Sequence, residues 1–194
     1  MKRLFLSAGL AIASTAAISA DAGQIVAGEN KVEFRSTVIF TLAGNVGIPN
    51  RGPLSATEDS FFSARGIAFE RASQFDFASL QTYVQEAVYT GEESQQHIPV
   101  FEGPRIIDLL SSVHAEGKTL VIHRLNGDPV TVPLAEAIKE GAVLAIRCNK
   151  IPFAIGDSGP VAVIFPDRLP EHDHTNHAAL GDAFIGSVFL IEIR

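Results

Sequence analysis

Runs of apolar residues predict most of the strands of this chain. Residues 31–42 alternate polar and apolar side chains, which is the period of a strand with one buried face. Three later runs are almost wholly apolar and predict buried strands: residues 142–148, 161–165 and 187–193. Stretches rich in glycine, proline or polar residues predict loops between the elements: residues 44–56, 91–99 and 171–183.

A β-hairpin is the clearest local prediction. Residues 119–125 form one apolar strand, and residues 130–132 form its partner. Asn126-Gly127 lies between them and is the pair typical of a type I′ turn, because both residues tolerate the positive φ angles that this turn requires. We therefore expect two antiparallel strands closed by a two-residue turn.

Three short helices are predicted between the strands. Asp76 can cap a helix over residues 77–88, whose apolar positions recur at helical spacing. Pro104 opens a second helix that stops near Gly117, and a third follows over residues 133–141. Strands and helices interleave without a regular βαβ period. This order predicts an α+β domain with a mixed β-sheet and short helices.

Several short motifs follow one another in a fixed order. They are Phe101-Glu102-Gly103-Pro104, Asp108-Leu109-Leu110, Gly117-Lys118-Thr119-Leu120, residues 132–137, residues 144–147, Gly159-Pro160, residues 163–166 and residues 187–193. Their order and spacing resemble the molybdopterin-binding oxidoreductase domain, the sulfite-oxidase-like family. Residues 45–52 and 75–80 resemble a short, exported branch of that family, and Phe189 stands where tryptophan is usual. The resemblance implies one sulfite-oxidase-like domain over residues 23–194.

The chain departs from that family at the metal ligand. The resemblance implies that catalytic members bind molybdenum through a cysteine between the first helix and the F-x-G motif, since soft, anionic sulfur suits this metal. Residues 89–99 occupy that place and contain no cysteine, and the single cysteine, Cys148, lies in a later apolar run typical of a buried strand. The basic residues that hold the pterin phosphate are not evident as a set. We therefore expect no molybdopterin and no resident cofactor.

Arg147 is the one charged residue in the apolar run of residues 142–148. Arg147 should either form an ion pair or face a cleft, and Asp157 in the turn over residues 156–160 is its expected partner. A structural ion pair explains Arg147 as well as a ligand contact does. If the family's cleft persists, we expect four residues to line it: His97, Arg147, Asn149 and Asp157.

Residues 171–177, Glu-His-Asp-His-Thr-Asn-His, hold the densest group of candidate metal ligands. His172 and His174 would share a face of an extended segment, whereas His174 and His177 would meet on a helical turn. Imidazole and carboxylate suit zinc, copper or nickel. A solvent-exposed polar loop can also contain several His and Asp residues without binding a metal ion. A metal ion at His172, His174 and His177 therefore stays an alternative.

The first residues predict export. Lys2 and Arg3 precede an apolar, small-residue stretch over residues 4–18, and small residues follow, which is the pattern of a secretory signal peptide cleaved after Ala20 or after Ala22. The stretch is short for a membrane span. A twin-arginine signal needs an Arg-Arg pair, so the general secretory route to a periplasm is favoured. That route passes unfolded chains, and a cofactor loaded beforehand would be lost.

The net charge and the lengths of the apolar stretches exclude several classes of partner. Removing Lys2 and Arg3 from the 15 basic residues leaves 13 against 22 acidic ones, a formal charge of about −9. This excess argues against nucleic acid and anionic lipid as partners. No later stretch is long and apolar enough to span a membrane, so we expect no membrane insertion after cleavage.

Together these features predict a periplasmic, non-catalytic ligand-binding or sensing module on an oxidoreductase-like fold. Its partner would be a small molecule or anion, or the periplasmic part of a membrane sensor. Two alternatives stay open. One is a molybdopterin- or metal-dependent oxidoreductase, and the other is a structural or interaction protein without a small ligand.

Overall fold

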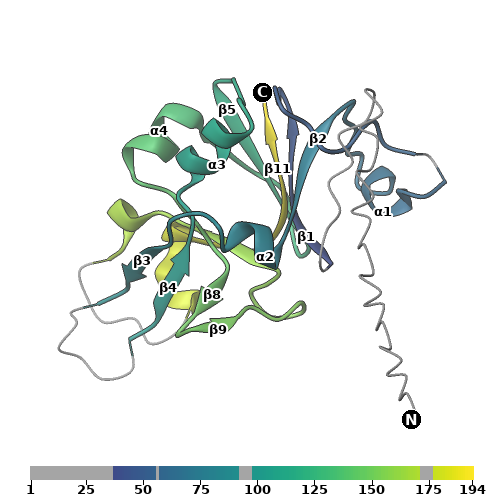
Figure 1. Cartoon of the computed structure of the whole chain (residues 1–194). Coiled ribbons are helices and arrows are strands. Elements are labelled where there is room, and N and C mark those ends of the chain that lie inside the picture. The colour runs from purple at the N-terminus through teal and green to yellow at the C-terminus, as the bar shows by residue number, and fades with distance from the viewer. Residues whose placement is uncertain (1–36, 56, 92–97, 171–176) are drawn as a thin grey trace, which may run out of the picture.

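The structure, a computed structural model, describes residues 37–55, 57–91, 98–170 and 177–194. These residues form two β-sheets with short helices around them (Figure 1). The main sheet has the strands β1 (Val38–Gly44), β2 (Ala72–Asp76), β5 (Thr119–Arg124), β6 (Val130–Pro133), β7 (Val143–Ala145), β10 (Val161–Ile164) and β11 (Phe184–Ile193). The small sheet has β3 (Glu86–Tyr89), β4 (Val100–Gly103), β8 (Arg147–Cys148) and β9 (Ile151–Pro152).

Strand β11 organises the main sheet. Along one edge it pairs with β10 in its first half and, in parallel, with β1 in its second half, while β5 runs antiparallel along the other edge. Its ladder to β5 shifts register between Val188 and Leu190, and Ser187 just before has a φ of 59°. This β-bulge bends the strand and redirects its side chains.

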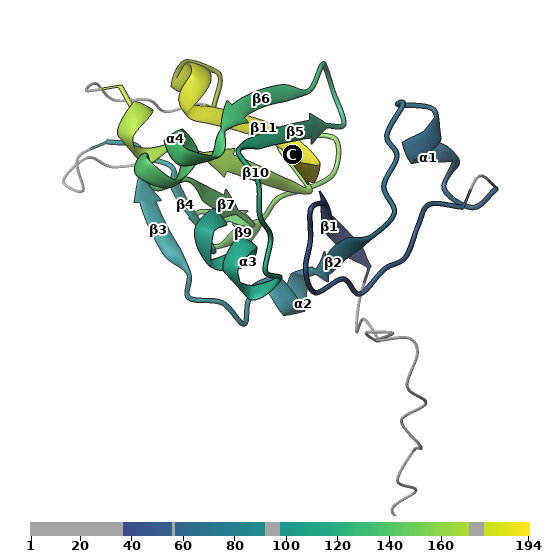
Figure 2. The same cartoon turned by 90° about the horizontal axis from the view of Figure 1, so that it is seen from above.

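Helices cover the main sheet on one side, and a long loop covers part of the other. Seen from above, α3 (Ile106–Ser112) and α4 (Leu134–Lys139) lie on one side, and α1 (Ser60–Ser63) lies far across on the other (Figure 2). The helix side holds the larger apolar core, which includes the fully buried Leu109, Leu120 and Leu144. The opposite side holds a smaller cluster that consists of Ala43, Ile67, Phe69, Ala72, Phe189 and Leu190.

The two sheets are joined by one continuous segment. The predicted strand over residues 142–148 is divided at Ile146, with β7 in the main sheet and β8 in the small sheet. Strand β4 crosses this segment closely at Gly103, where an added Cβ would lie only 1.9 Å from the carbonyl oxygen of Leu144. Only glycine permits this approach, so the backbones of the two sheets meet there directly.

The prediction of a helix over residues 77–88 is wrong beyond its first turn. Asp76 caps as expected, because its carboxylate accepts a hydrogen bond from the backbone N–H of Ser79 at 2.7 Å. The helix that follows, α2, covers only Phe77–Leu80, and residues 86–89 form strand β3 instead. Val84 occupies a helical core position in the pattern but is 80% exposed, whereas Val88 is buried by pairing with β4.

The hairpin of β5 and β6 forms, but the two-residue turn is wrong. A turn at Asn126-Gly127 alone would place Ile122 opposite Thr131, and the structure pairs Ile122 with Val130. Pairing to β6 stops at Ile122, whereas on its other edge β5 pairs with β11 as far as Arg124, and the N–H of Leu125 donates a hydrogen bond to the carbonyl of Ser187. The last residues of β5 therefore pair only with β11, and the connection to β6 is longer than two residues.

The other predicted elements begin within a few residues of their expected positions, although α3 ends at Ser112 rather than near Gly117. The short elements β2, β4, β9 and α1 were not predicted. Helix α3 begins two residues after Pro104, α4 begins directly after Pro133, and β10 and β11 lie on the predicted apolar runs. The short 3-10 helices η1 (Pro166–Arg168) and η2 (His177–Ala183) precede β11. The predicted α+β class with a mixed sheet is confirmed. None of the helices in the described part of the chain has the length and apolar character needed to cross a membrane.

Gly103→Ala should lower the free energy of unfolding by about 3 kcal/mol, because the new methyl group has no space beside the Leu144 carbonyl. Urea unfolding followed by circular dichroism measures this change. Gly52→Ala is the matched control, since nothing lies within 4 Å of the added Cβ at that exposed position, and a change within about 0.5 kcal/mol is expected. Equal stability of the two variants would contradict the close crossing.

Candidate ligand-binding site

Arg147 forms an ion pair with Glu102, not with Asp157. It lies opposite Glu102 in the β4–β8 ladder, with its Nε 3.5 Å from a carboxylate oxygen of that residue. Its guanidinium carbon also lies 5.8 Å from the centre of the Phe77 ring. The expected pairing with Asp157 is therefore wrong, because the cross-strand neighbour supplies the carboxylate instead.

Asn149, another cleft candidate, contacts the backbone at the start of β4. Asn149 has a φ of 49°, and its side-chain oxygen accepts a hydrogen bond from the backbone N–H of Val100 at 2.9 Å. This bond anchors the start of β4 and engages the side-chain oxygen of Asn149. His97 lies outside the described residues.

The single cysteine is placed as a core residue. Cys148 is half-buried and packs against the apolar cluster between the sheets, which contains Val88, Phe101 and Ile164. Burial raises the pKa of its thiol, which disfavours the thiolate that would bind a soft metal. Cys148 therefore lies in surroundings that favour the neutral thiol over a thiolate.

The histidine-rich loop lies largely outside the described residues. His172 and His174 lie outside the described residues, and His177 is the first residue of η2. Within the described ranges no three His, Cys, Asp or Glu side chains lie close enough together to hold a metal ion. The metal site at this loop stays a prediction.

Asp157 lines a polar hollow of about 270 Å³ on the turn before β10. The hollow is formed by Arg124, Asn126, Asp157, Ser158, Gly181, Phe184, Gly186 and Ser187. Two hydrogen bonds tie this turn to the bulge of β11: Ser187 donates its hydroxyl to the carbonyl of Asp157 at 3.0 Å and its N–H to the carbonyl of Ser158 at 2.6 Å. The turn is thereby fixed against the main sheet.

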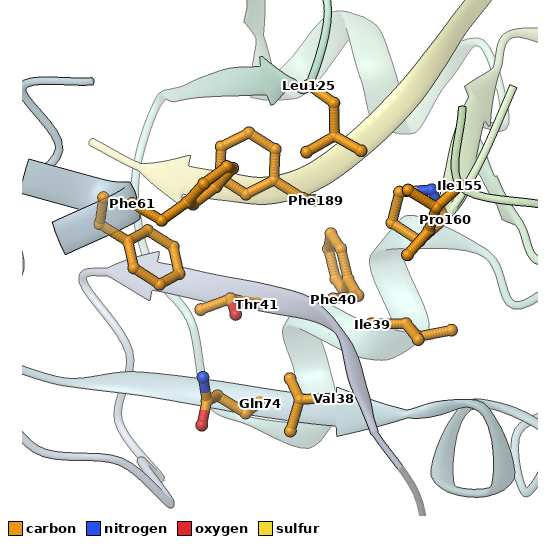
Figure 3. Close-up of a pocket in the computed structure, with 11 residues that line it drawn as sticks. Val38, Ile39, Phe40, Thr41, Phe61, Gln74, Leu125, Ile155, Pro160 and Phe189 are labelled. Atoms are coloured by element: carbon orange, nitrogen blue, oxygen red, sulfur yellow. The ribbon is translucent and has the colours of Figure 1, made fainter. Parts of the chain in front are cut away.

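An apolar groove of about 290 Å³ adjoins this hollow, since both use residues just after β5, in the turn before β10, and at the bulge of β11. We call it the phenylalanine groove; it is lined by Val38, Ile39, Phe40, Thr41, Phe61, Phe62, Gln74, Leu125, Ile155, Pro160 and Phe189. Figure 3 shows Phe61 at one end and Ile155 with Pro160 at the other. Thr41 and Gln74 are the two polar side chains, and neither is charged.

Three phenylalanine rings form one wall of this groove. The ring centres of Phe61 and Phe189 are 5.1 Å apart at an interplanar angle of 74°, and those of Phe61 and Phe62 are 5.7 Å apart at 85°. These are the edge-to-face geometries that aromatic rings prefer. The wall is not fully covered, because Phe61 remains 41% exposed, and Ile155 at the far end is 73% exposed.

Helix α1 and its two phenylalanines are carried on an arm, which we define as residues 51–71. Reciprocal backbone hydrogen bonds between Arg51 and Ala72 close the arm at its base. The Arg51 side chain forms an ion pair with Asp59 and lies over the rings of Phe62 and Phe69, 5.6 and 5.5 Å from their centres. The hydrogen bond from Arg51 lowers the pKa of the Asp59 carboxyl.

A buried histidine supports the groove from behind. The His123 ring lies 6.4 Å from the Phe189 ring, and its Nε2 is 3.7 Å from a carboxylate oxygen of Glu192, too far for a hydrogen bond. Burial lowers the pKa of His123. Hydrogen bonds of 2.8 and 2.7 Å from Arg194 lower the pKa of Glu192. Burial therefore disfavours the protonated form of His123, although the Glu192 carboxylate beside it acts in the opposite direction.

Sequence reasoning missed this groove. Its lining residues come from six separated segments, and among them Phe189 and Pro160 were singled out only for the family resemblance. Phe61-Phe62 in an otherwise polar stretch was the available indication, since two adjacent aromatic side chains outside a core run need a partner surface.

Comparison with known proteins identifies the architecture. No protein-family model matches the sequence, and no curated protein matches it. Among solved structures, the chain is similar to the sulfane dehydrogenase SoxCD from Paracoccus pantotrophus, with a TM-score of 0.50 and 12% sequence identity over 84% of this chain. The chain has the sulfite-oxidase-like fold. It spans 40% of the SoxCD chain, and at this identity the similarity concerns the fold alone.

The buried His123 predicts a pH-dependent stability. The unfolded chain protonates this histidine near pH 6.5, whereas the folded protein protonates it only at lower pH, so the free energy of unfolding should decrease as pH falls below about 6.5. His123→Leu should reduce that slope, by at most about 1.4 kcal/mol per pH unit. The free energy of unfolding, measured with a chemical denaturant at about pH 7.5, 6.5 and 5.5, tests this prediction, because these values span the range in which histidine ordinarily titrates.

Exposed His114 provides the control for this experiment, because its φ of 49° is tolerated by asparagine. His114→Asn should keep the wild-type pH dependence. Equal slopes for the wild-type protein and His123→Leu would show that His123 does not titrate with folding.

Proposed function

We propose that the mature protein is a periplasmic, non-catalytic binding module that takes a small apolar ligand in the phenylalanine groove. The observation that carries this proposal is the groove itself, an open hollow walled by three phenylalanines and by aliphatic side chains. Apolar surface left open on a protein in water marks a place where another apolar surface binds. The volume of about 290 Å³ lies at the lower end of small-ligand sites.

The location of the groove supports binding rather than core packing. It lies where the arm meets the main sheet, beside the bulge of β11, and its wall combines segments that are distant in sequence (Figure 3). Such junctions are usual places for ligands, since several segments contribute side chains to one hollow. The bulge adds to this, because bulges are frequent next to functional sites.

The non-catalytic part of the proposal rests on the donor atoms. The chain has one cysteine, and the raised pKa of Cys148 together with its apolar surroundings argues against molybdenum ligation. The export part rests on the sequence of residues 1–22, whose charged start, apolar stretch and small residues match a secretory signal peptide. A module of this kind would deliver its ligand or report it to a membrane sensor.

Phe61→Ala in the mature protein should weaken the binding of a neutral apolar probe, N-phenyl-1-naphthylamine, about tenfold, because one exposed wall of the groove is removed. Fluorescence titration measures the affinity. Ile155→Ser should act in the same direction from the other end. Val84→Ala is the matched control, since Val84 is 80% exposed and does not line the groove, and it should bind as the wild-type protein does.

Two results would overturn the proposal. One is the absence of saturable probe binding by the wild-type protein. The other is molybdenum at about one atom per chain, with the absorption of a bound pterin, in protein purified from its native compartment, which would establish an oxidoreductase.

A further inference from the structure

We infer that the ligand of the phenylalanine groove carries a carboxylate head group, which Arg65 binds at the rim. This inference rests on the proposed function and names the chemical class of the ligand: an amphipathic monocarboxylate with an apolar body. It follows from the position of Arg65, from its charge, and from the composition of the groove.

Arg65 lies along the aromatic wall. Its guanidinium carbon is 4.0 Å from the centre of the Phe61 ring and 5.9 Å from that of Phe189, and one of its terminal nitrogens donates a hydrogen bond of 3.4 Å to the carbonyl of Leu125. All three of these contact residues line the groove. The guanidinium group therefore spans from the arm to Leu125, the residue just after β5.

The positive charge of Arg65 has no carboxylate partner in the described part of the chain. Arg51 provides the comparison, because it contacts the same aromatic cluster and is neutralised by Asp59. Arg65 makes only cation–π contacts and one long hydrogen bond to a neutral carbonyl. Most of its N–H donors are thus available to an acceptor from outside.

The groove and Arg65 together select the ligand chemistry. The lining contributes two uncharged polar side chains, Thr41 and Gln74, and otherwise apolar groups, so a charged group is disfavoured inside the hollow. A guanidinium group matches a carboxylate in shape and charge. The attraction between them becomes stronger when aromatic rings shield one side of the guanidinium group from water. A molecule with an alkyl or aryl body in the groove and a carboxylate at the rim satisfies both parts.

The test compares two ligands that differ only in the head group. Decanoate and decanol, each below its aggregation concentration, displace the neutral naphthylamine probe from the mature protein. Wild-type protein should bind decanoate about tenfold more tightly than decanol, and added salt should weaken only decanoate. Arg65→Gln should remove the preference by weakening decanoate while leaving decanol unchanged. Arg105→Gln, an exposed arginine at the separate hollow beside α4, should behave as the wild-type protein.

The outcomes separate the inference from the proposed function. Equal affinities of the wild-type protein for decanoate and decanol would overturn the carboxylate inference and leave an apolar site. A preference for decanoate that persists in Arg65→Gln would overturn the role of Arg65. Binding to phosphatidylglycerol vesicles without binding of free decanoate would assign the surface to a membrane and overturn the inference. Failure of the probe and of both ligands to bind would instead overturn the proposed function.

Discussion

The crossing of β4 over the segment between β7 and β8 holds the two sheets in one structure. Backbone hydrogen bonds of 2.8 to 2.9 Å link Pro104 to Leu144 and Glu102 to Ile146. They form because Gly103 has no side chain at the point of contact. This crossing directs the run of residues 142–148 into both sheets, and it places Arg147 opposite Glu102 and Cys148 in the apolar cluster between them.

Local sequence patterns predicted the structure correctly where it depends on residues that are close together along the chain. The cap at Asp76, the helix starts near Pro104 and Pro133, and the apolar strand of residues 161–165 depend on residues a few positions apart, and all are found. The pattern was insufficient where a distant strand decides. Residues 86–89 repeat at helical spacing with α2 but pair with β4, and the end of β5 pairs with β11 instead of closing a tight turn.

The same distinction explains what was found of the site. A charge inside an apolar run indicated either an ion pair or a ligand contact at Arg147, with Asp157 as the expected partner. The structure pairs Arg147 with Glu102, its neighbour across the β4–β8 ladder, which the sequence alone does not place there. The groove could not be derived, because its wall joins residues 61 and 62 of the arm to residue 189 at the bulge of β11. No periodicity connects positions so far apart. Their meeting depends on the register of β1, β5 and β11.

The arm that carries α1 forms one wall of the phenylalanine groove and is attached to the main sheet at its base and through side-chain contacts. It leaves the main sheet at Arg51, returns at Ala72, and holds its place through the Arg51–Asp59 ion pair and a small apolar cluster that is separate from the larger core. Changes within this excursion can therefore alter one wall of the groove without disturbing the strands beneath it. A molecule seated there would touch arm and sheet at once. Its binding energy would then also fasten the arm, and ligand occupancy and local protection from proteases would rise together.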